Sequence, residues 1–125
     1  MKAHAAVAAT LLEDERGHGI AGFNGEAFVE RVLTDLDNSD LEEKEKVLLR
    51  FVDKVNHDSP SITAADMQHL YAAGWCDEAI YYAITVCALF NFYNRWVDAT
   101  GVHALSEEAH RAAGKRSASM GYVRE

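Results

Sequence analysis

One long apolar segment constrains the fold of this chain more than any other feature. Residues 74–102 read GWCDEAIYYAITVCALFNFYNRWVDATGV, a pattern that predicts a single long helix. One stripe of that helix carries Ile80, Ala83, Ile84, Cys87 and Ala88, and the opposite stripe carries Tyr82, Val86, Leu89, Phe90 and Tyr93. Two apolar faces need two neighbours, because each face must be removed from water. We therefore expect a core helix enclosed on every side, with residues 78–98 shared with another copy in a homo-oligomer.

Length and charge set the class of protein. The chain has 125 residues, which suits one domain over 1–125 with a flexible tail at 114–125. Its net charge is −8 and no basic patch is visible, so nucleic acid is not expected as a partner. Residues 79–92 are too short for a membrane span, which needs about 20 mainly apolar residues. No secretory leader is visible, so we expect a cytoplasmic location.

Helical patterns fill the rest of the chain, and no segment alternates with period two. The expected class is therefore all-α, with about six helices. Besides the core helix, helices are predicted over 2–14, 26–36, 40–57, from Thr63 to Gly74 and from Ser106 onward. Capping is predicted at Ser39 with Glu42, at Thr63 with Asp66, and at Asp77. The glycine-rich loop at 16–25 lacks the strand and the GK[ST] ending of a phosphate loop, so no cofactor is expected.

The two cysteines and the histidines show no metal or disulfide pattern. Cys76 and Cys87 are eleven residues apart on one predicted helix, so their Cα atoms lie about 16 Å apart. A disulfide needs a Cα separation below about 7 Å, so an intrachain bridge is excluded. Cys87 is expected to act as a small buried hydrophobe. The histidines show no HxxxH or HExxH spacing, so no metal site is predicted.

Polar residues within the apolar helix are the main site candidates. Asn91, Asn94 and Arg95 must find hydrogen-bond partners if they are buried, so they are expected to form a buried network. Arg95 should pair with a carboxylate, for which Asp66 and Asp98 are candidates. The alternative is an apolar pocket for a small ligand, lined by aromatic side chains at positions Tyr81, Tyr82, Phe90, Phe92, Tyr93 and Trp96.

The core segment resembles the end of the alkylhydroperoxidase D-like and carboxymuconolactone decarboxylase family, in particular its peroxidase-related branch. That family shows a glycine-aromatic-small-acidic start, an apolar helix, an F-N-x-x-N-R motif and a glycine stop. The matching positions are Gly74, Trp75, Asp77, Glu78, Ile80, Phe90, Asn91, Asn94, Arg95 and Gly101. Residues 40–73 resemble the two preceding helices of the family, so the resemblance spans about 40–103.

The resemblance also implies a catalytic motif, C-x-x-C-x-x-x-H with a glutamate upstream. The opening MKAHAAVAAT resembles the family residues that come after the second cysteine, so His4 matches the motif histidine. Both cysteines and the glutamate would fall before Met1. The family reaction is attack of a thiolate on a hydroperoxide, followed by resolution of the sulfenic acid by a second cysteine. Neither Cys76 nor Cys87 is an obvious substitute for that pair.

Three functional classes therefore stay open. One is an active peroxidase-related or decarboxylase-like enzyme, in which histidine would be the acid or base. Another is a degenerate family member that keeps the helical homo-oligomer and binds a small apolar ligand. The third is a fragment whose catalytic half lies before Met1. The missing CxxC argues against a peroxidase, and we expect the degenerate or truncated oligomer.

Overall fold

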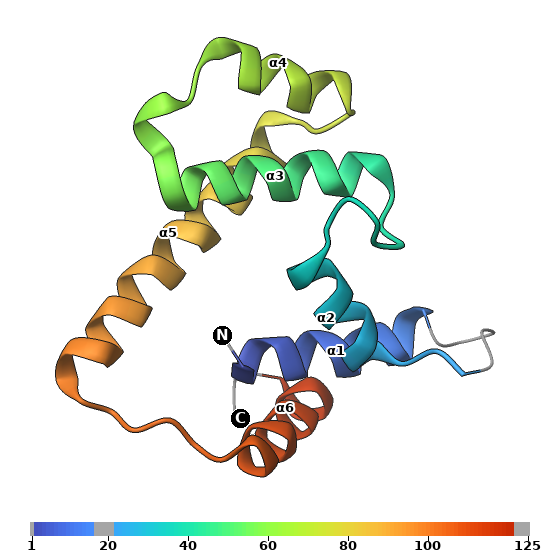
Figure 1. Cartoon of the computed structure of the whole chain (residues 1–125), viewed down its shortest axis with the longest axis vertical. Helices are drawn as coiled ribbons and strands as arrows, with labels where there is room; N and C mark the ends of the chain where they lie inside the picture. The colour runs from blue at the N-terminus through green and yellow to red at the C-terminus, as the bar shows by residue number, and fades with distance from the viewer. Residues whose placement is uncertain (1, 17–21, 122–125) are drawn as a thin grey trace. The chain divides into compact units, whose positions relative to one another are not determined.

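The computed structural model describes residues 2–16 and 22–121, and all regular structure within these ranges is helical (Figure 1). This confirms the predicted all-α class. The helices are α1 (Lys2–Arg16), α2 (Gly25–Thr34), α3 (Glu43–Asp58), the 3₁₀ turn η1 (Ser59–Ser61), α4 (Ala64–Ala72), α5 (Asp77–Thr100) and α6 (Glu107–Met120). Gly17 and Gly19 of the predicted glycine loop, and the last four residues of the predicted tail, lie outside the described residues.

The helices pack as two compact units. One consists of Met1–Asp40 with Ala104–Glu125 and contains α1, α2 and α6, and the other consists of Leu41–His103 and contains α3, α4 and α5. The single domain over residues 1–125 that the length suggests stays a prediction. No helix in the described ranges is both long enough and apolar enough to cross a bilayer.

In the first unit, α2 approaches α1 closely at Gly25. A Cβ atom added at Gly25 would collide with the backbone oxygen of Ala9. The Gly25 amide also donates a hydrogen bond of 3.0 Å to Oε1 of Glu13. The side chain of Asn24 caps α2 by accepting from the amide of Ala27. Only a residue without a side chain lets these two helices meet here.

Helix α6 corrects the prediction of a flexible tail beginning at Gly114. The helix starts as expected, with the Ser106 side chain accepting from the Ala109 amide, but it continues to Met120. It packs against α1. Its shielded face carries mostly small side chains, at positions His110, Ala113, Gly114, Ser117 and Ala118. Tertiary packing along this stripe outweighs the low helix propensity of glycine.

The second unit is built around a small core. Phe51 of α3, Leu70 of α4 and Ile80 of α5 are 6%, 0% and 1% exposed, and half-buried hydrophobic side chains surround them. Trp75 closes one end of this core, and its Nε1 donates a 2.8 Å hydrogen bond to the backbone oxygen of Lys44. The three helices of this unit are therefore held by a core of only a few large side chains.

Helix starts in the second unit follow the capping rules, with two corrections. Thr63 and Asp66 form the predicted capping box at α4. At α3 the N-cap is Glu42, which forms a box with Glu45, because the Ser39 hydroxyl instead donates to the backbone oxygen of Leu36. At α5 the N-cap is Cys76 rather than Asp77. Both errors are small shifts of the residue that begins the helix, which is the least certain part of an expected helix.

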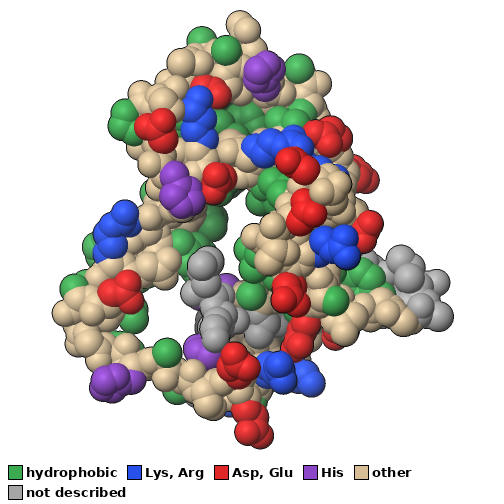
Figure 2. All heavy atoms as spheres, viewed as in Figure 1, with side chains coloured by type: hydrophobic (Ala, Val, Ile, Leu, Met, Phe, Trp, Pro, Cys, Tyr) green, Lys and Arg blue, Asp and Glu red, His purple; other side chains and the backbone are tan. Residues whose placement is uncertain are grey.

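Within this chain helix α5 is covered on one face only, and the expected enclosure of its other face by a second copy stays a prediction. Ile80 and Cys87 are buried against the rest of the unit, whereas Tyr82, Val86 and Tyr93 are 59%, 51% and 56% exposed. Figure 2 shows apolar side chains reaching the surface along this helix. The two stripes expected from the sequence exist, but the chain supplies a neighbour, α3, for one of them. The other stripe faces solvent.

Candidate functional site

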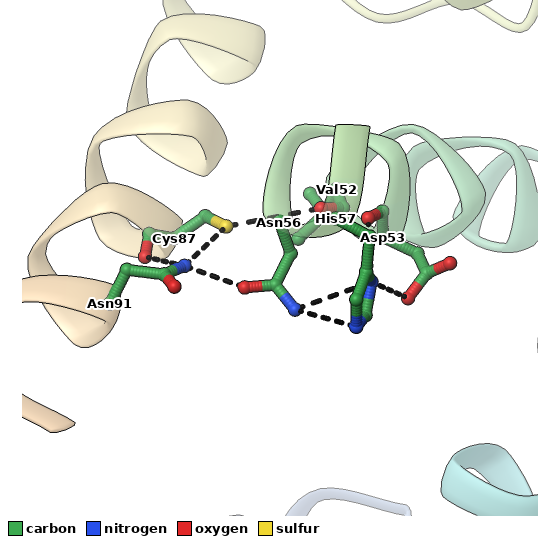
Figure 3. A network of polar contacts seen from close by, with 6 residues as sticks. All are labelled: Val52, Asp53, Asn56, His57, Cys87 and Asn91. Atoms are coloured by element: carbon green, nitrogen blue, oxygen red, sulfur yellow. Dashed lines mark hydrogen bonds and ion pairs between the residues drawn. The ribbon is translucent and has the colours of Figure 1, made fainter. Parts of the chain in front are cut away.

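A chain of polar contacts crosses from α5 to α3 at Asn91 (Figure 3). Asn91 Nδ2 donates to Oδ1 of Asn56 over 2.6 Å and to the backbone oxygen of Cys87 over 3.1 Å. Asn91 is half-buried and Asn56 is exposed. The contact joins two helices through residues 35 positions apart, so it fixes how far α5 is shifted along α3.

The chain of contacts continues along α3 to the surface. Nδ2 of Asn56 lies 3.4 and 3.3 Å from the two ring nitrogens of His57. Nδ1 of His57 lies 3.0 Å from Oδ1 of Asp53, one helical turn earlier. Both side chains of this last pair are about 70% exposed, at 68% and 73%. An exposed pair of this kind contributes little to stability, and nothing in this arrangement shields a reacting group from water.

Arg95 ends the network on the α5 side, where it bonds to Asn91 instead of the carboxylate expected from the sequence. Its Nη1 donates to Oδ1 of Asn91 over 2.6 Å and to the backbone oxygen of Asn91 over 3.0 Å. The guanidinium is exposed, so it needs no carboxylate to compensate for lost hydration. The predicted pairing with Asp66 or Asp98 is therefore wrong. The amide of Asn91 is used fully, with its nitrogen donating and its oxygen accepting.

Asn94 does not join the network. Its side chain is exposed and has no hydrogen-bond partner among the described residues. Asn94 lies on the same side of the helix as Cys87, seven positions earlier, but residues 92–96 are all exposed, so the cover of α5 ends before Asn94. Of the three polar residues expected in a buried network, only Asn91 reaches the interface between the helices.

Cys87 is a buried thiol beside this network. It is 9% exposed, and its Sγ donates to the backbone oxygen of Val52 at 3.8 Å. Its Sγ also accepts from Nδ2 of Asn91 at 3.7 Å. Cys76 is exposed, and neither cysteine is in a disulfide. The expected burial of Cys87 and the excluded bridge are both confirmed.

Asp66 has a structural role in α4. Both of its oxygens accept from Nζ of Lys54 at 2.9 Å, and Oδ2 also accepts from the Thr63 amide at 2.7 Å. These hydrogen bonds, with the Lys54 contact the largest cause, hold the pKa of Asp66 down at about 2. The carboxylate thus caps α4 and ties it to α3.

His4 and Tyr71 are two further residues whose pKa values are shifted. His4 lies on α1 in the other unit, and its partial burial lowers its pKa. The hydroxyl of Tyr71 donates to Oδ1 of Asp77 over 2.6 Å, and this hydrogen bond raises the pKa of Tyr71. Tyr71 ties α4 to the first turn of α5. Within the described ranges no three His, Cys, Asp or Glu side chains cluster as metal ligands would.

The aromatic side chains of α5 lie on its open face. Tyr81, Phe92 and Trp96 are 66%, 60% and 55% exposed. A cavity of about 310 Å³ lies among α1, α2 and α6, and a hollow of about 540 Å³ lies between α3 and α4, and no aromatic side chain of α5 lines either one. A small apolar ligand held by these aromatic residues stays a prediction.

Sequence reasoning missed Asn56, His57 and Asp53 as members of the site. A signal for Asn56 was present, because it follows Val52 by one turn on the α3 face that carries Phe51 and Val55. A polar residue that continues an apolar stripe is a candidate partner for a polar residue on the facing helix. Comparisons with protein-family models, with curated proteins and with solved structures find no match to this chain.

The Asn91–Asn56 contact should be measurable as a coupling energy. Asn91→Ala and Asn56→Ala should each destabilise the protein, and the double variant should lose less than the sum by about 0.5–1.5 kcal/mol, the net value of one hydrogen bond. Denaturant unfolding measures all three. Asn94→Ala is the matched control and should stay within about 0.5 kcal/mol of the parent. A coupling of zero would show that the two amides do not meet in solution.

Asp66 should make the stability depend on pH in the acid range. Its pKa of about 2 in the folded protein lies below its ordinary value of 3.8, so its stabilising effect is complete above the ordinary value and fades as the pH falls towards 2. Asp66→Asn should therefore be less stable than the parent at pH 5, and the difference should narrow by pH 2.5. Asp98→Asn is the control. A difference between parent and Asp66→Asn that stays constant with pH would contradict this account.

Proposed function

We propose that this chain is an alkylhydroperoxidase-like helical protein that forms a homo-oligomer through the open face of α5 and does not reduce peroxides through its own cysteines. The observation that carries this proposal is the exposed apolar face of α5. The resemblance of residues 40–103 to that family supports the family assignment.

The size of the open face supports self-association. Seven large side chains on it are 37–60% exposed: Tyr82, Val86, Leu89, Phe90, Phe92, Tyr93 and Trp96. An aromatic side chain can bury about 150–250 Å², so roughly half-exposed side chains leave on the order of 700 Å² per copy. A standard protein interface buries about 800 Å² per partner. An exposed apolar patch of this size is unusual on a monomer.

The composition of the face favours an identical partner. The sixteen residues from Ala79 to Asn94 contain no charged side chain, whereas the chain as a whole carries a net charge of −8. Depletion of charge with enrichment in Tyr, Trp and Phe is typical of the centre of an interface between subunits. A second copy presents the same uncharged aromatic surface, so both faces are removed from water together.

The cysteines support the absence of peroxidase activity. Reduction of a hydroperoxide needs an accessible thiolate and a second thiol that resolves the sulfenic acid. The buried Cys87 thiol donates to Val52, and Cys76 begins the same helix eleven residues earlier. At about 1.5 Å rise per residue the two cannot meet. The exposed Asp53–His57 pair lies beside no accessible thiol that it could activate, among the residues that the structure describes.

Self-association should depend on the centre of the open face. Val86→Glu places a charge on this face and should convert the oligomer into a monomer, because a buried unpaired carboxylate costs several kcal/mol. Sedimentation equilibrium gives the mass. Val102→Glu, a matched change at a position that is 59% exposed outside the helix, should leave the mass unchanged. A parent chain that sediments as a monomer at all concentrations would overturn the proposal.

Peroxide turnover should be absent. With a thiol reductant and hydrogen peroxide or an organic hydroperoxide, the parent chain should consume peroxide no faster than the reductant alone. Cys76→Ser and Cys87→Ser should behave in the same way. Turnover that either substitution abolishes would establish a peroxidatic cysteine and would replace the proposed function by that of an enzyme.

A further inference from the structure

The open face of α5 contains a regular seam. Its residues occur at steps of three and four positions, in the order Ala79, Tyr82, Val86, Leu89, Tyr93 and Trp96. This 3-4 spacing is the a/d pattern of two helices that pack along each other. Asn91 and Ile84 lie on the opposite side of the helix, where α5 meets α3. The seam residues from Tyr82 to Trp96 are exposed and Ala79 is half-buried, so most of the seam points away from its own unit.

We propose that α5 pairs with α5 of a second copy in antiparallel orientation, along this seam. The inference rests on the proposed self-association and adds its geometry. In an antiparallel pair each a position faces a d position, so the layers are Ala79 with Trp96 of the second copy, Tyr82 with Tyr93, and Val86 with Leu89. The two-fold axis passes between residues 87 and 88.

Side-chain volume favours this orientation. The seam has its smallest residue, Ala79, at one end and its largest, Trp96, at the other. In the antiparallel pair each Trp96 fills the space left by Ala79, so the layers are similar in volume. In a parallel pair two Trp96 side chains would meet at one end and two alanines at the other. Close packing disfavours both the overfilled layer and the empty one.

The shape of the second unit favours the same orientation. Figure 1 shows α5 crossing α3 and continuing past it. After Asn91 the helix has little cover, since Phe92, Tyr93, Asn94, Arg95 and Trp96 are all exposed. The first half of α5 is held against α3 and α4 through Ile80 and Ile84. In an antiparallel pair, the projecting half of each α5 packs on the supported first half of α5 in the other copy. In a parallel pair, the two projecting halves would pack only on each other.

Distances between spin labels distinguish the two orientations. In a Cys76→Ser background, where the remaining Cys87 is 9% exposed, single labels are placed through Ala88→Cys, Asn94→Cys and Glu78→Cys, all exposed positions outside the seam. In the antiparallel pair the offset along the axis is about 2 Å at 88, about 20 Å at 94 and about 28 Å at 78. We therefore expect the measured distance to rise in that order.

A parallel pair would give three similar distances. That result, with a dimeric mass, would overturn the antiparallel geometry and leave the proposed self-association standing. A monomeric mass without dipolar coupling would overturn both. A mass above two chains with the same rise in distance would still support antiparallel pairing of α5, as one contact of a larger assembly.

A substitution in the seam gives an independent test, because it should weaken association in an antiparallel pair and strengthen it in a parallel pair. Ala79→Leu overfills the layer that contains Trp96 of the second copy, so the dissociation constant of the antiparallel pair should rise about tenfold or more. The double variant Ala79→Leu with Trp96→Ala should regain association relative to Ala79→Leu alone. In a parallel pair Ala79→Leu would fill an empty layer and strengthen association, which would contradict the proposal.

Discussion

The packing of one narrow face of α5 on α3 is the contact on which the second unit depends. Ile80 joins Phe51 and Leu70 in the core, and Cys87 and Asn91 extend the contact further along the helix. The core is small for a helix of 24 residues. Because burial of apolar surface supplies most of the stabilisation of a fold, an α5 packed on one side leaves much of its own apolar surface unused.

The polar residues of the site add hydrogen bonds between the helices to this packing. Asn91 joins α5 to Asn56 of α3 and accepts from Arg95, so its amide sets the register of the two helices. Asp66 does the same for α4 through Lys54. Hydrogen bonds between elements select one arrangement among several that an apolar surface would allow. These hydrogen bonds hold α3, α4 and α5 in position relative to one another, as the proposed presentation of the α5 surface requires.

The sequence predicted the helices well because their signals are local. Periodic apolar residues marked α3 and α5, and Thr63 with Asp66 marked the start of α4. The two stripes of α5 were also predicted correctly as opposite apolar faces. What periodicity could not supply is the neighbour of each stripe, since an apolar residue carries no information on which element covers it. For this reason the expected sharing of residues 78–98 with another copy stays a prediction.

The remaining errors have the same origin in tertiary contacts. Gly114 suggested the end of a helix, yet the small-residue stripe of α6 packs on α1 and carries the helix to Met120. Arg95 suggested a buried ion pair, yet its position beyond the end of the contact with α3 leaves it in water. Asn56 went unnoticed because a single asparagine near the end of a helix looks like surface until the facing residue, Asn91, is known.

The central claim is that the second apolar face of α5 is completed by another copy of the chain, and amide hydrogen exchange along α5 tests it most directly. From Phe92 to Thr100 the helix has little cover of its own, so its amides should exchange slowly in concentrated protein and much faster on dilution. The amides around Ile80 should change little. Exchange from Phe92 to Thr100 that is equally fast, or equally slow, at every concentration would contradict the claim.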